Sequence, residues 1–307
     1  MDETLSRITA TIFVCCFAAL SAFGQQIESG KLFQGQNISL YYEVRGAKSG
    51  TPLIVVNGGP GVDHTYMHFT LQRTSAFDEL AKSRPVIFYD QRGVARSPAL
   101  KPGQSCTFAD QIADLDALRA YLGYERIDLL GHSYGGLLAM AYATRYPERI
   151  VHLILADSAA PKFSDTTFLF DKIFPETSER IEANTAATET EIKAFMLDYL
   201  SMLFYSPANR NAYLAKVKNP TRNMPITIAL GSELQKVDLN PEIAKISFPT
   251  FVVTGRFDVN VAPLVAYKIH KAIPHSRFFV FEHSGHLPFY EEQKEFVRLL
   301  EGFLSVK

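Results

Sequence analysis

The sequence of 307 residues contains no tryptophan and only three cysteines, and its charges nearly cancel. Two of the cysteines, Cys15 and Cys16, lie in an apolar N-terminal segment, which leaves Cys106 for the rest of the chain. A single cysteine can form neither an intramolecular disulfide nor a cysteine metal cluster, so we interpret Cys106 as an inert thiol. The formal net charge of −1 provides no broad basic field for nucleic acid or an anionic membrane.

The sequence also lacks internal repeats, low-complexity tracts and a recognisable metal motif. His64 and His68 are four residues apart but lack the glutamate of a helical zinc site, so we predict neither a metal nor a cofactor. The hydrophobic fraction of 47% and the charged fraction of 21% are typical of a globular protein with a sizeable core. The length suits one large domain or two smaller ones.

An almost unbroken apolar run covers residues 8–23, after Arg7. It is too short for a comfortable membrane span, and Ala22-Phe23-Gly24 has small residues where a signal peptidase cleaves. We therefore expect residues 1–24 to be a cleaved signal peptide. The mature chain would be exported to the periplasm or the extracellular space, without stable membrane association. An uncleaved anchor and a misplaced start codon are the alternatives.

Short apolar runs that end in glycine-rich or polar loops alternate with helical patterns along most of the chain. Runs buried on both faces are typical of strands in a parallel sheet, so we expect the α/β class with a site beyond the carboxyl ends of the strands. The expected strands are residues 38–44, 52–56, 85–89, 127–130, 151–156, 249–254 and 277–281, and the expected core helices include 108–122, 263–273 and 291–303.

Residues 161–247 contain no convincing buried strand. Apolar side chains recur at helical spacing between Ile192 and Leu203, which predicts an amphipathic helix. An all-helical insertion between two strands is typical of a lid or cap. We therefore divide the mature chain into a first part of the core (25–160), a helical cap (161–247) and a second part of the core (248–307).

Residues 131–136 read Gly-His-Ser-Tyr-Gly-Gly between an expected strand and an expected helix. A Gly-x-Ser-x-Gly pattern in that position indicates a nucleophile elbow, in which glycines relieve the crowding of a sharp turn. Ser133 would then stand at the start of a helix, exposed at the end of the sheet. His132, the variable residue of the pattern, is expected to lie behind it.

A serine nucleophile needs a base, and the base needs an acid that orients it. In a fold with this elbow the chain order is serine, acid, histidine. Asp258 follows the strand expected at 249–254, and His286 follows the last expected strand. Asp157 is an alternative acid and His283 an alternative base, because both also follow strands.

An oxyanion needs two preorganised N–H donors. One should be the backbone N–H of Tyr134, directly after the nucleophile. The glycine loop of residues 58–61 follows another strand at the same edge of the expected sheet, and we expect Gly59 to supply the second donor. A plain turn is the alternative interpretation of that loop.

Together these stretches make the chain resemble the proline iminopeptidase branch of the α/β-hydrolase superfamily. The family's His-Gly-Gly-Pro-Gly appears as Asn-Gly-Gly-Pro-Gly at 57–61, and its Asp-Gln-Arg-Gly-x-Gly-x-Ser appears at 90–97 with Ala95 for the second glycine. Its Gly-x-Ser-Trp-Gly-Gly lies at 131–136 with Tyr134 for tryptophan, and its Gly-Arg-Tyr-Asp at 255–258 with Phe257 for tyrosine. Its Gly-His near the C-terminus corresponds to Gly285 and His286.

The resemblance implies an α/β-hydrolase fold, with a mostly parallel central sheet, flanking helices and an inserted helical cap. It also implies that Ser133, Asp258 and His286 form a catalytic triad. The substrate would be a short peptide or small molecule, cleaved by an aminopeptidase that releases N-terminal proline or another small residue. An esterase or lactonase is the alternative within the serine hydrolases, and a non-catalytic binding protein is the alternative outside them.

Three features depart from the family pattern. Asn57 replaces the histidine of the oxyanion loop, and the chain lacks the tryptophans that the family places around its substrate. No acidic residue can be assigned to a free α-amine. The candidates in the cap also fit solvated helix faces, and they are Glu176, Glu179, Glu189, Glu191 and Asp198.

Overall fold

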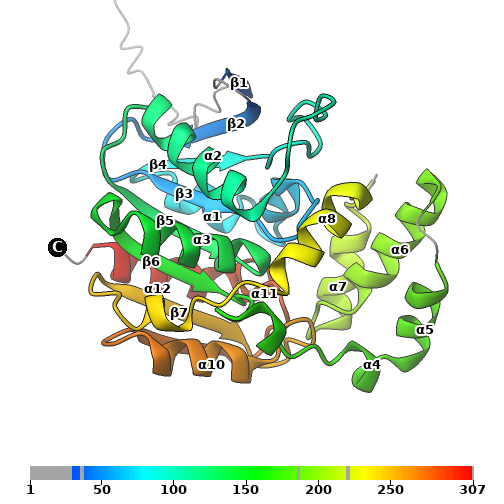
Figure 1. Cartoon of the computed structure of the whole chain (residues 1–307). Coiled ribbons are helices and arrows are strands. Elements are labelled where there is room, and N and C mark those ends of the chain that lie inside the picture. Colours follow the sequence, from blue (N-terminus) through cyan, green and yellow to red (C-terminus); the bar gives the residue numbers. More distant parts are fainter. Residues whose placement is uncertain (1–29, 35–37, 185–186, 219–221, 306–307) are drawn as a thin grey trace, which may run out of the picture.

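The computed structural model describes residues 30–34, 38–184, 187–218 and 222–305 (Figure 1). The signal peptide expected at residues 1–24 lies outside these ranges. None of the helices within them is long and apolar enough to cross a membrane.

The core is built on a single sheet of eight strands in the order β1-β2-β4-β3-β5-β6-β7-β8. The pairings of β1 with β2 and of β2 with β4 are antiparallel, and all the others are parallel. The strands are β1 (Lys31–Gln34), β2 (Ser39–Gly46), β3 (Leu53–Val56), β4 (Pro85–Tyr89), β5 (Ile127–His132), β6 (Ile150–Ala156), β7 (Thr250–Gly255) and β8 (Arg277–Phe281).

The mostly parallel sheet confirms the predicted fold class. Every residue of β3, β4, β5 and β7 is buried, as continuous apolar runs covered on both faces require. The structure adds β1, which we did not predict from the sequence. This strand has four residues and lies at the edge of the sheet, where it pairs with β2. A strand this short has no long apolar run that would identify it in the sequence.

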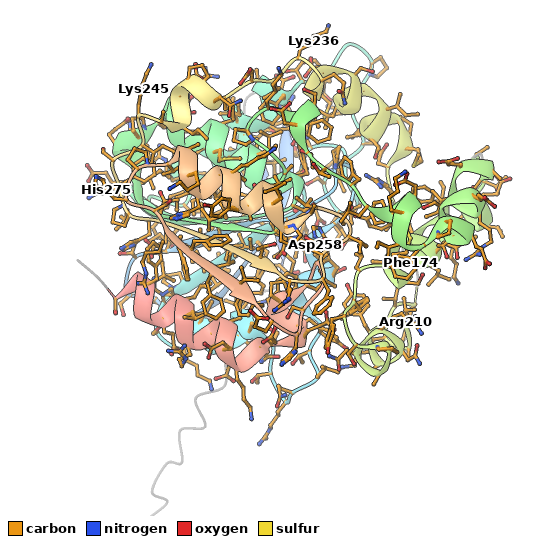
Figure 2. All side chains as sticks on the ribbon, turned by 90° about the horizontal axis from the view of Figure 1, so that it is seen from below. Phe174, Arg210, Lys236, Lys245, Asp258 and His275 are labelled. Carbon is orange, nitrogen blue, oxygen red and sulfur yellow. The ribbon has the colours of Figure 1, made fainter. Side chains whose placement is uncertain are left out.

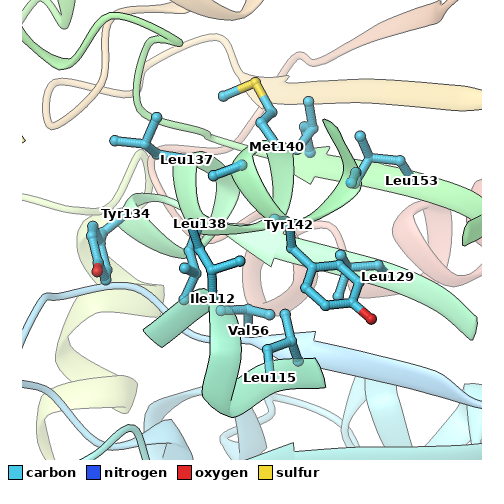
Figure 3. Close-up of a cluster of buried hydrophobic side chains, with 14 of the residues drawn as sticks. Val56, Ile112, Leu115, Leu129, Tyr134, Leu137, Leu138, Met140, Tyr142 and Leu153 are labelled. Atoms are coloured by element: carbon cyan, nitrogen blue, oxygen red, sulfur yellow. The ribbon is translucent and has the colours of Figure 1, made fainter. Parts of the chain in front are cut away.

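Helices cover both faces of the sheet. One hydrophobic cluster joins the sheet to α2 (Phe108–Tyr121), α3 (Tyr134–Arg145) and α10 (Pro263–Ala272). A second cluster on the opposite face contains α1 (Ala76–Leu80) and α12 (Gln293–Leu304), which contact each other. Figure 3 shows how α3 packs on the sheet through side chains such as Leu138 and Tyr142, both of which are fully buried.

Within the segment that we expected to be a cap, residues 161–247, the described residues form helices and one isolated bridge between Lys162 and Asp238. Figure 1 shows α4 to α8 grouped at one end of the core. The helices are η3 (Phe163–Asp165), α4 (Phe170–Ile173), α5 (Pro175–Ala183), α6 (Glu189–Ser201), α7 (Pro207–Leu214), α8 (Met224–Leu234) and α9 (Asn240–Ile243). The amphipathic pattern corresponds to α6, which buries Met196 and Leu200.

The remaining short elements are η1 (His64–His68), η2 (Pro147–Arg149) and α11 (Pro288–Glu291). η1 follows the glycine loop after β3, and α11 follows the loop that carries His286. Both therefore lie next to residues of the expected site.

Candidate active site

Ser133 lies in the sharp turn between β5 and α3, with φ 58° and ψ −125°. A side chain on Gly131 would put its Cβ 2.3 Å from the Gly135 carbonyl oxygen, and one on Gly135 would put its Cβ 2.2 Å from the Val56 oxygen. Both distances are far below any van der Waals contact, so only glycine fits on either side of the serine. The turn has the steric character that we expected of a nucleophile elbow.

Asp258 and His286 are in direct contact. His286 Nδ1 lies 2.7 Å from Asp258 Oδ2. The other oxygen, Asp258 Oδ1, accepts hydrogen bonds from the backbone N–H groups of Asn260 and Val261 at 2.8 and 2.9 Å. The carboxylate is thereby fixed, and it holds the ring of His286 in one orientation. Figure 2 shows Asp258 at the side of the core that faces Phe174, between α4 and α5, and Arg210 in α7.

The second ring nitrogen of His286 has a partner that sequence reasoning missed. Asn260 Nδ2 lies 2.8 Å from His286 Nε2, and both groups are buried. With Nδ1–H donating to Asp258, Nε2 of a neutral ring is an acceptor, and the Asn260 amide donates to it. In the sequence, Asn260 stands two residues after Asp258. No general rule predicts from that position that its side chain contacts His286.

The alternative acid, Asp157, is also buried beside Asp258. Its Oδ1 accepts from the Gly255 N–H at 2.9 Å, and its Oδ2 has no hydrogen-bond partner among the described residues. Burial and the negative charge of Asp258 raise the pKa of Asp157 well above the ordinary carboxyl value. The surroundings of Asp157 therefore favour its protonated form, and it makes no hydrogen bond to His286 in the described structure.

The alternative base, His283, is exposed, and its ring lies 5.6 Å from that of Tyr205. It is not among the residues that line the cavity in front of Ser133, whereas His286 is.

Both expected oxyanion donors are available. Within the described part of the chain, neither the Gly59 N–H nor the Tyr134 N–H donates to a protein acceptor. Asn57, which departs from the family pattern, is fully buried and braces the loop, because its Nδ2 donates to the carbonyl oxygens of Gly58 and Val62 at 2.9 and 2.7 Å. The side chain of Asn57 therefore supports the loop without a histidine.

A chain of hydrogen bonds joins the oxyanion loop to the loop of His286. Gly58 donates its N–H to the Tyr66 hydroxyl at 2.7 Å, and that hydroxyl lies 2.6 Å from His132 Nδ1. His132 Nε2 lies 2.8 Å from the backbone oxygen of His286, so Nε2 carries the proton and Nδ1 accepts from Tyr66. Burial lowers the pKa of His132 well below its ordinary value, which keeps the ring neutral. The sequence did not indicate Tyr66.

The motif at residues 90–97 stabilises the core next to the site through hydrogen bonds and ion pairs. Asp90 contacts His64 Nδ1 at 2.7 Å and Arg96 Nε at 2.8 Å, and Gln91 donates to the Asn57 oxygen at 3.1 Å. Arg92 forms a bidentate pair with Asp114, with both distances 2.6 Å.

Among the residues that the structure describes, two groups of side chains could supply ligands to a metal. Asp157, Asp258 and His286 form one, but hydrogen bonding within the group already engages Asp258 and His286. Glu43, His64 and His68 form the other. There Arg45 donates to His68 at 2.8 Å and Arg96 to Glu43 at 3.1 Å. Two guanidinium groups at the same position oppose a further cation, so this group is an ion-pair network.

A cavity of about 280 Å³ lies in front of Ser133 and His286. Its walls come from the glycine loop, η1, α6 and the segment between α7 and α8. Its charged lining residues are Asp63, Lys216, Lys218 and Arg222. The Tyr134 side chain lies elsewhere and bonds to Gln111 at 2.8 Å, so it does not replace the family's tryptophan at the substrate.

The five cap acids that we considered for an α-amine do not line this cavity. Glu176, Glu179 and Glu189 are exposed. Glu191 accepts from the Thr188 N–H at the start of its own helix, and Asp198 pairs with Arg180 at 2.8 Å. These acids therefore lie on the surface of the cap helices or stabilise those helices.

The cap is tied directly to the loop of His286. The His286 N–H donates to the Leu203 oxygen at 2.8 Å. Glu291 accepts from the N–H groups of Gly285, Tyr205 and Ser206 at 2.8, 3.0 and 3.0 Å. The position of the cap and the position of His286 are therefore coupled.

Comparison with known proteins agrees with this geometry. Residues 51–293 match the family described as alpha/beta hydrolase fold. Among curated relatives, a proline iminopeptidase of Lactiplantibacillus plantarum is 30% identical over 86% of this chain and 96% of its own length, and one of Saccharolobus solfataricus is 29% identical over 94% and 96%.

Solved structures show the same fold. An alpha/beta fold family hydrolase from Bacillus anthracis has a TM-score of 0.74 at 22% identity, over 90% of this chain and 99% of its own. An esterase from Exiguobacterium antarcticum has a TM-score of 0.70 at 24% identity, over 91% and 100%. The chain belongs to the α/β-hydrolase fold family, in its proline iminopeptidase-like branch, and is a hydrolase of that family.

Proposed function

We propose that the chain is a serine hydrolase that acts through an acyl-enzyme. The observation that carries this proposal is the contact of His286 with Asp258 in front of the same cavity that Ser133 lines. The strained backbone of Ser133 and the two unengaged N–H groups beside it support the same chemistry.

The residues act in a fixed order. His286 Nε2 exchanges its hydrogen bond with Asn260 for one with Ser133 and removes the hydroxyl proton as Ser133 attacks the substrate carbonyl. The N–H groups of Gly59 and Tyr134 stabilise the oxyanion. His286 then protonates the leaving group, and the same base activates a water molecule that hydrolyses the acyl-enzyme. Asp258 stabilises the charged ring throughout.

Within this class we propose an aminopeptidase that releases N-terminal proline or another small residue. The support is the group of curated proline iminopeptidases to which the chain is similar over most of its length. An ammonium group taken out of water needs a carboxylate partner. Asp63 is the one acid among the described residues that line the cavity, and we assign the α-amine to it. Its Oδ1 accepts from the Thr65 N–H at 2.7 Å, and its Oδ2 is free within the described structure.

The test compares prolyl and alanyl arylamides with their N-acetylated forms. The free amines should be cleaved and the acetylated forms rejected. Asp63→Asn should weaken kcat/KM for the free amines by about 2–5 kcal/mol, the usual cost of breaking a buried charge pair, and spare simple esters. Asp198→Asn, an acid outside the cavity, is the matched control and should have little effect.

Faster cleavage of blocked substrates or plain acyl esters than of every free aminoacyl substrate would overturn the aminopeptidase assignment. An esterase or lactonase would then take its place.

We also propose that the chain is exported. The support is the apolar run of residues 8–23 followed by Ala22-Phe23-Gly24. N-terminal sequencing of the exported protein should begin at Gln25. An exported soluble protein that retains Met1 would contradict the proposal.

A further inference from the structure

Arg222 has an unusual position among the charged residues that line the cavity. It directly precedes the N-cap of α8, and its Nε donates to the Pro60 carbonyl oxygen and to Thr227 Oγ1, both at 3.2 Å. The centre of its guanidinium lies 6.0 Å from the Phe195 ring. These contacts engage Nε at the oxyanion loop, and Arg222 lines the cavity with no hydrogen bond from its two terminal nitrogens to a described residue.

No carboxylate in the described part of the chain pairs with Arg222. Among the described residues none lies within 4.0 Å of it, and residues 219–221 that precede it contain no acidic side chain. Other partly buried arginines do have such partners, as Arg92 pairs with Asp114 at 2.6 Å and Arg96 with Asp90 at 2.8 Å. Burial lowers the pKa of Arg222, and only the nearby Tyr199 opposes that effect.

The other charged residues that line the cavity do not neutralise the positive charge of Arg222. Lys216 and Lys218 are exposed cations at its rim, and Lys216 donates to the Thr70 carbonyl oxygen. Asp63 is the single acid in the described lining, and it forms no ion pair with Arg222. The lining therefore carries an excess of positive charge, with one cationic side chain that is both partly buried and unpaired.

The unengaged donors of Arg222 have a natural ligand. The terminal nitrogens of a guanidinium present N–H groups in a planar fork that matches both oxygens of a carboxylate. The Nε position is already used, so the fork that remains is the one formed by the two terminal nitrogens. Because Arg222 contacts the oxyanion loop through Pro60, a carboxylate bound there lies near the scissile carbonyl.

In a dipeptide the scissile carbonyl and the terminal carboxylate are one residue apart, about 3.8 Å between successive Cα atoms. A tripeptide adds one more such step. The cavity of about 280 Å³ lies just below the range of roughly 300–1,000 Å³ that is usual for drug-sized ligands. A short peptide fits these dimensions, with its amine at Asp63 and its carboxylate at the cationic side.

We propose that Arg222 binds the free carboxylate of the substrate, so that the enzyme acts on dipeptides and tripeptides with an unblocked C-terminus. This inference rests on the proposed aminopeptidase function and adds a substrate class to it. It also explains why the guanidinium is held by a carbonyl and a hydroxyl and not by an acid.

The experiment measures kcat/KM for Pro-Ala, for its C-terminal amide and for prolyl arylamide. Wild type should prefer the free acid over the amide by about 10- to 100-fold, as expected for hydrogen bonds to a charged group. Arg222→Gln should bring the ratio of acid to amide close to one. Arg298→Gln is the matched control, because it removes an exposed guanidinium that does not line the cavity. It should leave all three rates and their ratio unchanged.

Equal cleavage of acid and amide by the wild type would overturn the inference, as would an unchanged ratio in Arg222→Gln. A fourth substrate, aspartyl arylamide, tests whether the carboxylate belongs on the acyl side, and cleavage of it faster than alanyl arylamide would also overturn the inference. Failure of the proposed function is a different result, in which the wild type cleaves none of the free-amine substrates.

Discussion

The amide nitrogen of Asn260 lies 2.8 Å from His286 Nε2, the ring nitrogen that receives the proton of Ser133 in the mechanism that we propose. The same residue donates its backbone N–H to Asp258 Oδ1 at 2.8 Å. Asn260 therefore contacts both the acid and the base, through its backbone and its side chain respectively. In the described structure His286 Nε2 is engaged by an amide group.

Replacing Asn260 with alanine removes the contact to Nε2 and keeps the backbone donor to Asp258. Because His286 no longer has to release an amide before it accepts the Ser133 proton, we expect turnover and fluorophosphonate labelling at least as fast as in the wild type. Stopped-flow labelling measures this directly. A loss of about a hundredfold or more, the size of a lost general base, would show that Asn260 holds the base in its productive position.

The two buried acids should respond differently to amide substitution. Asp258→Asn presents an amide to His286 Nδ1 and favours the wrong tautomer, so kcat should fall by about 10⁴-fold. Asp157 makes no hydrogen bond to His286 in the described structure, and its burial raises its pKa, so Asp157→Asn should retain most of the activity. Steady-state kinetics of the two variants on one substrate separate the roles. A reversed order would make Asp157 the acid of the triad.

His64 should make the stability depend on pH. Burial acts to lower its pKa, but the contacts with Asp90 and Glu43 prevail and raise the pKa above the ordinary value of 6.5. A raised histidine pKa stabilises the fold fully below pH 6.5, and this contribution is lost as pH rises through the folded-state value. The Tm difference between the wild type and His64→Gln should therefore shrink with rising pH. A difference that grows would contradict the assignment.

Glu291 should matter for both stability and activity, because three backbone N–H groups from the cap and from the His286 loop converge on it. Glu291→Ala removes the acceptor of three backbone donors, two of them partly buried, and should cost about 1–3 kcal/mol of unfolding free energy, with a lower kcat. Glu295, whose partner Arg298 is exposed, supplies the matched control, and Glu295→Ala should change stability by less than about 1 kcal/mol. Equal effects of the two variants would rule out a special role for Glu291.

The sheet could be predicted because its buried strands are continuous apolar runs, and Pro85–Tyr89 and Arg277–Phe281 have the predicted bounds. Ser133, Asp258 and His286 could be predicted as one site because they follow strands whose carboxyl ends meet at one edge. The pattern of residues along the chain was sufficient to predict the strands and the positions of these three residues after them.

Contacts between distant side chains were not predictable in this way. Tyr66 and Asn260 act through hydrogen bonds to residues 66 and 26 positions away, His132 and His286, and their own sequence contexts are ordinary. Arg222 has no acidic partner among the described residues, and a sequence cannot reveal which charged side chains are paired. The net charge of the cavity lining could therefore be determined only from the structure.

Covalent labelling identifies the nucleophile, which we propose to be Ser133. Incubation with a fluorophosphonate followed by peptide mass spectrometry should find the adduct on Ser133 in the wild type. Ser133→Ala should remain folded, form no adduct and lose activity by about a thousandfold or more. A folded Ser133→Ala variant that keeps wild-type turnover, or a wild type that labels elsewhere or not at all, would contradict the account.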